Sequence, residues 1–187
     1  MRLVFLGPPG AGKGTQAKRV AERLSVPAIS TGDIFRANVG SGTELGLLAK
    51  QYMDKGEYVP DSVTNDMVRA RLAEPDTENG FLLDGYPRTT AQLDVLDEAL
   101  AAAGRPLDAV VELTADTDEV VGRLLKRAEI EGRADDTEDV IRRRLEVYAE
   151  QTAPLTAIYH AHGLVRQVDG MGGVDEVTDR MASALEG

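Results

Sequence analysis

A glycine-rich run near the start of the chain has the residue types that bind phosphate. Gly7 and Gly12 come before Lys13 at the spacing of a phosphate-binding loop. Glycine lets the backbone curl so that its N–H groups point inward, and a helix that starts after the loop adds unpaired N–H groups and a positive dipole end. Because the run lies between the apolar residues 3–6 and an amphipathic segment, it predicts a phosphate-binding loop rather than a plain glycine-rich turn.

One position of this loop departs from the usual pattern. Gly14 stands where a hydroxyl side chain usually follows the lysine, and Thr15 comes one position later. A contact between that hydroxyl and a magnesium ion is therefore less firmly predicted here than the phosphate-binding loop itself.

Arginine side chains form a second set of candidate phosphate ligands, since a planar guanidinium can bind phosphate oxygens through two hydrogen bonds. Arg88 stands directly after Gly85-Tyr86-Pro87, a rigid turn at a predicted strand end that would aim the side chain. An acidic protein that binds a polyanion must gather its arginines at one place. The candidates are Arg36, Arg88, Arg123, Arg127, Arg133 and Arg144, whereas we expect Arg142 and Arg143 to make only weak surface pairs.

Composition restricts the class of protein. The chain has 187 residues and a formal net charge of −11, which argues against non-specific binding of nucleic acid. It contains no cysteine, which excludes disulfides and cysteine-ligated zinc. No apolar run approaches the length of a membrane span or resembles a signal peptide, so we expect a cytoplasmic protein that does not bind membranes.

Five short apolar runs alternate with helical patterns along the chain. This alternation predicts one α/β domain, in which a five-stranded parallel sheet has helices on both faces and right-handed crossovers. The expected strands are residues 2–6, 27–30, 80–83, 108–113 and 164–168. The expected helices are residues 13–24, 31–39, 43–54, 61–72 with Asp61 as N-cap, 89–103, 114–127, 137–160 and 173–186, with an irregular segment at 128–136.

Several polar segments follow the carboxyl ends of the predicted strands. These segments are the phosphate loop and residues 30–33, 84–88 and 169–170. Ligands of parallel α/β sheets bind at that edge. We therefore expect residues far apart in the sequence to form one crevice there.

Together these stretches resemble the adenylate kinases, which are P-loop nucleoside monophosphate kinases, and the resemblance covers the whole chain. It is carried by residues 7–16, by Ser30-Thr31-Gly32-Asp33 with Arg36, by 84–88 with Gln92, by Arg123 with Arg127, and by 133–136 with Arg144. The resemblance implies the P-loop NTP-binding fold and reversible phosphoryl transfer from MgATP to AMP, giving two ADP. It implies a monomer with a core (1–29, 60–125 and 137–187), a helical AMP-binding insertion (30–59) and a short lid (126–136).

The resemblance also implies roles on the ATP side. Lys13 would bridge toward the transferred phosphoryl group, and Gly172 would contact the adenine through its backbone. Asp84 would hold magnesium through water molecules, with Asp33 as its neighbour in that role. The residues that would bind the ATP phosphates are Gly10, Ala11, Gly12, Lys13, Gly14, Thr15, Arg123 and Arg127.

On the AMP side, the resemblance implies that Arg88 binds the phosphate and Gln92 the adenine edge, while Glu57, Tyr58 and Val59 line the base through backbone groups. Arg133 and Arg144 would reach the phosphates from the lid. The remaining AMP residues would be Thr31, Arg36, Gly85, Tyr86 and Pro87, and the catalytic set would be Lys13, Arg88, Arg123, Arg133 and Arg144.

The short segment after Arg127 departs from the longer members of the family. Those members carry a large lid, sometimes with zinc-binding cysteines, and this chain has no cysteine. We therefore expect no zinc. The acidic stretch Ala128-Glu129-Ile130-Glu131 is unsuited to covering phosphates, and we expect it to face solvent.

The chemistry needs cations rather than a general base, because the acceptor is a phosphate oxygen whose second pKa is about 6. His160 and His162 end a predicted helix far from every motif, and we expect them to have no catalytic role. Two alternatives stay open. One is a kinase for UMP or CMP, which Thr31 and Gln92 disfavour; the other is a non-catalytic ATP-binding module, against which the second cation set argues.

Overall fold

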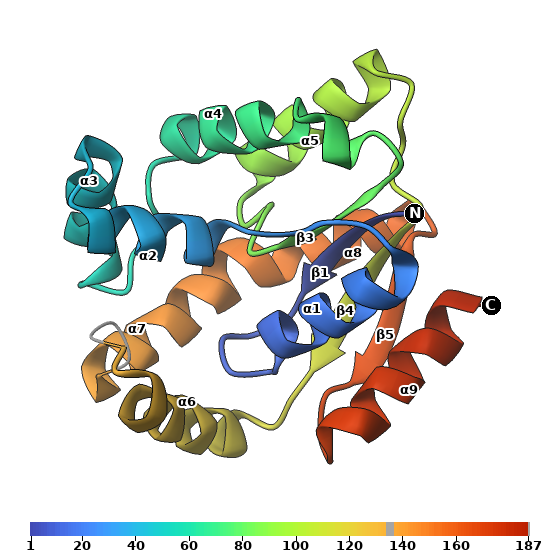
Figure 1. The fold of residues 1–187 in the computed structure, drawn as a ribbon. Helices are drawn as coiled ribbons and strands as arrows, with labels where there is room; N and C mark the ends of the chain where they lie inside the picture. The colour runs from blue at the N-terminus through green and yellow to red at the C-terminus, as the bar shows by residue number, and fades with distance from the viewer. Residues whose placement is uncertain (134–136, 187) are drawn as a thin grey trace.

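The structure, a computed structural model, describes residues 1–133 and 137–186. Within them, five parallel strands form one sheet in the order β2-β3-β1-β4-β5 (Figure 1). Each strand lies within one residue of its predicted range, which confirms the α/β fold. The strands are β1 (Arg2–Leu6), β2 (Ala28–Ser30), β3 (Phe81–Asp84), β4 (Ala109–Thr114) and β5 (Val165–Asp169).

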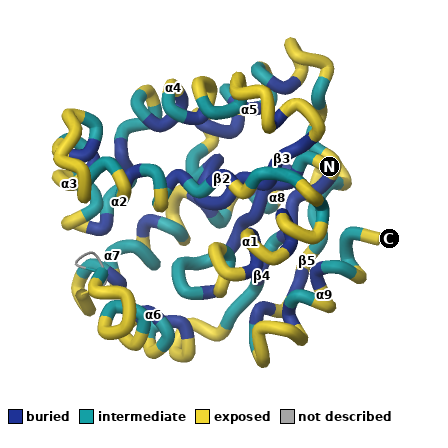
Figure 2. The backbone as a smooth tube through the Cα atoms, in the orientation of Figure 1, coloured by how far each residue is buried: buried dark blue, intermediate teal, exposed yellow. Residues whose placement is uncertain are grey.

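Helices cover both faces of this sheet, as the sequence predicted. In β1, Leu3 and Phe5 pack under α1 and α9, while Val4 and Leu6 face α4, α5 and α8. Strands buried on both faces are expected in a parallel sheet covered by crossover helices, and the buried centre is visible in Figure 2. The helices are α1 (Lys13–Leu24), α2 (Thr31–Ser41), α3 (Glu44–Met53), α4 (Asp61–Leu72), η1 (Pro75–Thr77), α5 (Thr90–Ala102), α6 (Thr117–Glu131), α7 (Glu138–Val147), η2 (Tyr148–Thr152), α8 (Ala153–Ala161) and α9 (Val174–Glu186).

Two helix pairs extend from the carboxyl edge of the sheet (Figure 1). Helices α2 and α3 pack around Phe35 and Ala49, and Gly46 lets them approach closely, because a Cβ there would lie 2.1 Å from the carbonyl oxygen of Asn38. Helices α6 and α7 pack around Leu124 and Ile141. These pairs stand on either side of the edge where ligands of such sheets bind.

Helix α6 is longer than predicted. It continues through residues 128–131, and Gly132 ends it in the left-handed conformation with φ 62°. The prediction of an irregular segment was therefore wrong for these residues, because no helix breaker precedes Gly132. Glu129, Ile130 and Glu131 are exposed, as expected, while Ala128 is half-buried. Residues 134–136 of the predicted lid lie outside the described residues.

The predicted single helix over 137–160 is also corrected. Helices α7 and α8 are joined by a wider turn, η2, in which the Ala153 N–H donates to the Tyr148 carbonyl five residues earlier. Pro154 gives the reason, since proline has no N–H and its ring presses against the carbonyl four residues earlier in a regular helix. Within the described residues, no helix combines the length and apolar character needed to cross a bilayer.

Candidate active site

Two cavities open at the carboxyl edge of the sheet, and they share part of their lining. The larger lies against the phosphate loop and α6, and the smaller against α2, the turn after β3 and η2. Molecules bound in the two cavities would meet across the shared side chains. Those residues are Pro9, Lys13, Gly32, Arg36, Arg88 and Arg144.

The loop between β1 and α1 has the shape that its glycines predict. Gly12 precedes α1 in the left-handed conformation, with φ 93°. Gly10 faces α6 so closely that a Cβ would lie 2.9 Å from the side chains of Val120 and Leu124. Residues 9–16 all line the larger cavity, so the first turn of α1 forms part of its wall. An anion there would meet backbone N–H groups and the positive end of the α1 dipole.

Lys13 lies at the boundary between the two cavities. Its Nζ donates to the carbonyl oxygens of Gly7 at 2.7 Å and Pro8 at 2.9 Å. The pKa of Lys13 is lowered to about 8. Burial is the largest cause and nearby arginines act in the same direction, while the Asp84 carboxylate opposes both. Bound phosphates would relieve this repulsion among cations.

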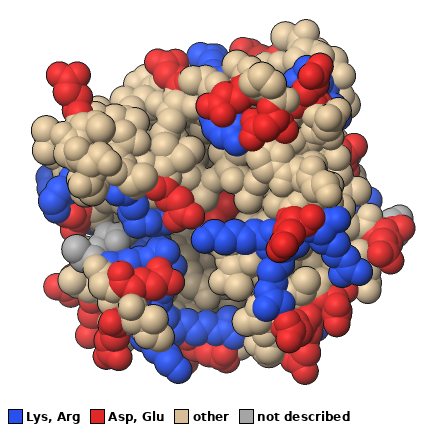
Figure 3. Space-filling view, in the orientation of Figure 1, with Lys and Arg blue, Asp and Glu red and all other residues tan. Residues whose placement is uncertain are grey.

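The structure brings all six predicted arginines together, because each of them lines the larger cavity. Figure 3 shows Lys and Arg side chains bordering the hollow on this face. Arg123 donates to the Gly170 carbonyl at 3.2 Å and to the Glu119 carboxylate at 2.7 Å, while Arg133 pairs with Glu131 at 2.5 Å. The carboxylates hold these guanidinium groups beside the cavity.

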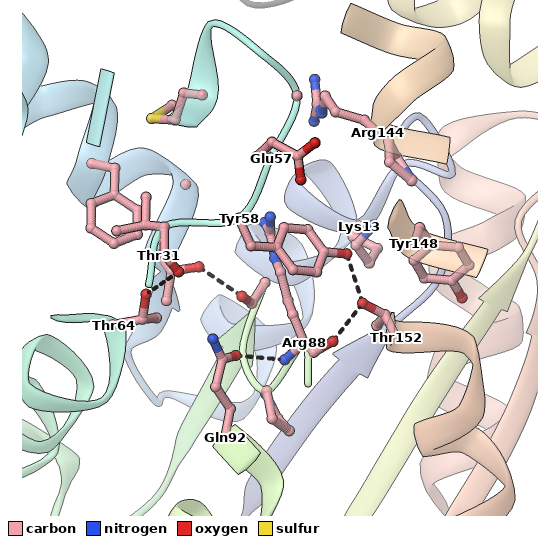
Figure 4. A pocket seen from close by; sticks show the side chains of 18 of the residues that line it. Lys13, Thr31, Glu57, Tyr58, Thr64, Arg88, Gln92, Arg144, Tyr148 and Thr152 are labelled. Atoms are coloured by element: carbon pink, nitrogen blue, oxygen red, sulfur yellow. Dashed lines mark hydrogen bonds between the residues drawn. The ribbon is translucent and has the colours of Figure 1, made fainter. Parts of the chain in front are cut away.

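The smaller cavity combines apolar and polar walls (Figure 4). Phe35, Met53 and Val59 supply apolar surface that suits a planar base. The Thr31 hydroxyl donates to the Gly85 carbonyl at 2.8 Å, which ties α2 to the turn after β3. The predicted residues that line this cavity are Thr31, Arg36, Glu57, Tyr58, Val59, Gly85, Pro87, Arg88, Gln92 and Arg144.

Tyr86 does not line either cavity. Its ring is 1% exposed and packs in the core beneath the site. Its hydroxyl donates to Asn65 Oδ1 at 2.8 Å, and burial raises the pKa of Tyr86 to about 12. The apolar contacts of the core therefore account for this residue, and its side chain supports the turn from below.

Arg88 is fixed along its whole length. Its N–H donates to Gln92 Oε1 at 2.7 Å, and its carbonyl accepts from the Thr152 hydroxyl at 2.7 Å. Its guanidinium carbon lies 5.1 Å from the centroid of the Tyr58 ring, a distance at which the cation is attracted by the ring face. The guanidinium is thereby directed into the space between the two cavities.

Gln92 and Asp61 connect the helices behind this turn. Gln92 is 1% exposed, and its Nε2 donates to Asp61 Oδ1 at 2.8 Å. The Thr89 hydroxyl donates to the same oxygen at 3.0 Å. Asp61 was predicted as the N-cap of α4, but Pro60 occupies that position, and the Asp61 carboxylate instead joins α4 to α5.

Arg143 forms surface ion pairs, as predicted, with Glu57 at 2.7 Å and Glu146 at 3.1 Å. Its Nε donates to Glu57 Oε1 across to the segment that lines the smaller cavity. Gly56 also lies against α7, because a Cβ at Gly56 would stand 2.9 Å from the Val140 carbonyl oxygen. Arg142 behaves as expected and pairs with Glu138 on the exposed face of α7.

Comparison with known proteins agrees with this geometry. The adenylate kinase family model matches residues 5–164. Adenylate kinase from Nocardioides sp. is 67% identical over 186 residues, covering 100% of this chain and 97% of that protein. Those from Kocuria rhizophila and Thermobifida fusca are 62% and 58% identical, covering 99% and 100% of this chain and 98% of each relative. The chain belongs to the adenylate kinase family.

Adenylate kinases use ATP with magnesium, and Asp84 is the carboxylate that best fits such an ion. It ends β3 at the wall of the larger cavity, with 8% of its surface exposed. A single carboxylate suits Mg²⁺, which keeps several waters and takes further oxygens from substrate phosphates. The described residues contain no cluster of three or more His, Asp or Glu side chains that could hold a metal.

Asp33 fits the metal less well than Asp84. It already forms an ion pair with Arg36 at 2.7 Å. Burial acts to raise the pKa of Asp33, but the hydrogen bond and charge of Arg36 outweigh it and hold that pKa below the usual range. In this adenylate kinase fold, Asp33 therefore orients an arginine of the shared wall.

Gly172 lies in the loop after β5, with φ 104°, and lines the larger cavity but not the smaller one. Sequence reasoning missed Thr152, Tyr148 and Asp61, which line or support the smaller cavity. The Thr152-Ala153-Pro154 sequence could have indicated the first two, because a proline there predicts a disturbed helix that can expose neighbouring polar groups.

Proposed function

We propose that this chain, an enzyme that phosphorylates AMP with ATP, binds ATP in the larger cavity and AMP in the smaller one. The two nucleotides would then place their phosphates against the shared residues Lys13, Arg36, Arg88 and Arg144. This shared wall is the observation that carries the proposal. A protein with one nucleotide site needs only one cation-lined cavity.

On the ATP side, backbone N–H groups of the phosphate loop hold the phosphates. Lys13 leaves the Gly7 and Pro8 carbonyls to follow the transferred group. Arg123, Arg127, Arg133 and Arg144 neutralise the phosphate charge from α6, α7 and the segment between them. Gly172 meets the adenine through its backbone. The loop residues in this role are Gly10, Ala11, Gly12, Gly14 and Thr15, all of which line the larger cavity.

On the AMP side, Arg88 and Arg36 bind the phosphate and the apolar wall accepts the adenine. Thr31, Gln92 and the backbone of residues 57–59 complete the pocket, with Gly85 and Pro87 beneath it. The Gln92 amide already bonds to Asp61 and to the Arg88 backbone. The orientation of the Gln92 amide toward the adenine is therefore fixed, because the amide cannot rotate freely.

The chain's own residues act by positioning and by charge neutralisation. The loose transition state of phosphoryl transfer spreads negative charge over the equatorial oxygens, and fixed cations stabilise it. Magnesium, which Asp84 would hold with the nucleotide, adds positive charge on the phosphate oxygens. No side chain has to remove a proton, because the accepting AMP phosphate is ionised near neutral pH.

Water has to be kept from the phosphates during transfer. We assign this task to the insertion at 30–59 and to the lid, whose described part, residues 126–133, lies beside the crevice. Both would close over the phosphates from a fixed core. We keep the monomer that the resemblance implies as the predicted oligomeric state. We keep the cytoplasm as the predicted compartment.

The experiment is ADP formation from MgATP with AMP, GMP, CMP or UMP as acceptor. We expect rapid turnover with AMP alone. A Lys13→Met preparation serves as control, because any activity that it retains reports a contaminating kinase.

Two results would overturn the proposal in different ways. If CMP or UMP is the best acceptor, the base pocket is misassigned while the phosphate wall stands. If no acceptor reacts although ATP binds, the chain is an ATP-binding module and the proposed mechanism fails.

A further inference from the structure

The Thr152 hydroxyl lies at the centre of a small network around Arg88 (Figure 4). It is 2.7 Å from the Arg88 carbonyl oxygen and 2.7 Å from the Tyr58 hydroxyl. The residue is 4% exposed, although it lines the smaller cavity. We propose that Thr152 is a positioning residue, whose hydroxyl sets the direction of the Arg88 guanidinium toward the bound monophosphate.

The direction of each hydrogen bond follows from elementary chemistry. A carbonyl oxygen can only accept, so the single proton of the Thr152 hydroxyl goes to Arg88. The Tyr58 hydroxyl must then donate its own proton to Thr152. Two hydroxyl groups and one carbonyl thus form a chain with one fixed order, Tyr58 to Thr152 to Arg88.

The Tyr58 ring connects this hydrogen-bond network back to Arg88. Thr152 fixes the Tyr58 ring by its hydroxyl, and the face of that ring holds the Arg88 guanidinium 5.1 Å from its centroid. Thr152 also fixes the Arg88 main chain directly. Removing one hydroxyl would therefore free Arg88 at its carbonyl and at its guanidinium together.

The wide turn η2 places Thr152 at this point. In a regular helix through Pro154, the proline ring would press on the Glu150 carbonyl, and the turn relieves this by spanning five residues. Turns of this kind inside helices recur at functional sites. Thr152 thus connects the helix that carries Arg144 to the turn that carries Arg88 and to the segment that carries Tyr58.

The test compares two substitutions at this position. Thr152→Val removes the hydroxyl and keeps a branched side chain, whereas Thr152→Ser keeps the hydroxyl. Because two hydrogen bonds are lost, we expect Thr152→Val to lower kcat/KM for AMP about tenfold and to change KM for ATP less than about twofold. Thr152→Ser should keep most of the activity.

Two further variants make the comparison specific. Thr156→Val is the matched control, because this hydroxyl lies four residues further on, in α8, and donates to Glu112 at 3.0 Å, outside both cavities. We expect no change in the kinetics. Tyr58→Phe should also lower kcat/KM for AMP, and the double variant with Thr152→Val should be no worse than Thr152→Val alone. Tyr58→Phe also carries the test if Thr152→Val does not fold.

The inference rests on the proposed assignment of Arg88 to AMP, so Arg88→Ala is measured alongside. A severe loss in Arg88→Ala with wild-type kinetics in Thr152→Val overturns the role of Thr152 alone. Equal losses in the Val and Ser variants, or an equal rise in KM for ATP, also overturn it. Unchanged AMP kinetics in Arg88→Ala overturn the assignment of Arg88 itself.

Discussion

Lys13 is a half-buried cation among other cations, and this makes its charge depend on pH. Its ammonium group has two carbonyl partners but lies near Arg88, Arg127 and Arg144. Burial is the largest cause of its lowered pKa of about 8. Nucleotide phosphates favour the charged form, so their binding must raise that pKa.

ATP binding should therefore take up a proton at high pH. Below pH 8, Lys13 is protonated in both free and bound protein, and affinity should be flat. Above pH 8, free Lys13 loses its proton while bound Lys13 keeps it, so Kd should rise by up to about tenfold per pH unit. Calorimetry in two buffers of different ionisation enthalpy measures the uptake, which we expect to be near zero at pH 7 and near one at pH 9.

A Lys13→Met variant provides the control for this pH dependence. It should bind ATP weakly and show no proton uptake at pH 9. The same uptake in the variant and the unsubstituted protein would contradict the assignment of the titration to Lys13.

Sequence spacing predicted Lys13 because the phosphate loop is one continuous stretch. The arginines could be predicted because placing a charged guanidinium without a partner costs free energy. Sequence spacing missed Thr152, Asp61 and the Glu57 contact of Arg143 for a different reason. Their partners lie far away in the chain, so only the packed fold brings them together. A lone threonine on a helix has no local pattern that distinguishes it from a surface residue.

At the scale of elements, the apolar periodicity predicted every strand and most helix ends. It failed where a helix continues without a change in pattern, as at residues 128–131, and where a proline widens a helix without ending it, as at η2. Periodicity reports which face is buried and is insensitive to one extra residue in a turn. Periodicity also does not predict the distance between two packed helices. For α2 and α3, Gly46 sets that distance.

Two glycines of this pair give a matched test. Gly46→Ala would push a Cβ into the α2 backbone, and we expect it to destabilise the protein by about 1–3 kcal/mol and to raise KM for AMP. Gly40 lies inside α2 with open space around it, so Gly40→Ala should stabilise by about 0.5–1 kcal/mol. Urea unfolding of both variants measures these changes.

The essential result is that the free energy of unfolding changes in opposite directions at the two positions. If Gly40→Ala slows turnover despite added stability, the residue acts as a hinge. If Gly46→Ala is neutral, the α2–α3 packing described above is wrong.

At the scale of the whole molecule, a chain with a net charge of −11 gathers seven arginines and two lysines along one crevice. The sheet accounts for this, since all of its strands are parallel and their carboxyl ends share one edge. That edge could be predicted from the order of the elements. The division of the crevice into two cavities could be expected only from the resemblance, because their common wall depends on how the helix pairs lean over the sheet.

A common wall predicts strong binding of one molecule that fills both cavities. Two adenosines joined by five phosphates should bind at least about 100-fold more tightly than ATP, because linking the two ligands removes the entropy cost of a second association. Fluorescence competition or calorimetry measures this ratio. A tetraphosphate carrying one adenosine is the control and should gain little over ATP. Equal affinity for both compounds would indicate a single nucleotide site.

The wide turn at Tyr148–Thr152 also sets the rotational phase between the helices that it joins. Each residue of an α-helix advances the side-chain direction by about 100°. Ile141 of α7 faces Leu124 of α6, whereas Leu155 and Tyr159 of α8 face the sheet. Deleting one residue between them would turn Leu155 and Tyr159 away from the sheet by about that angle. We therefore expect this segment to tolerate substitutions more readily than insertions or deletions.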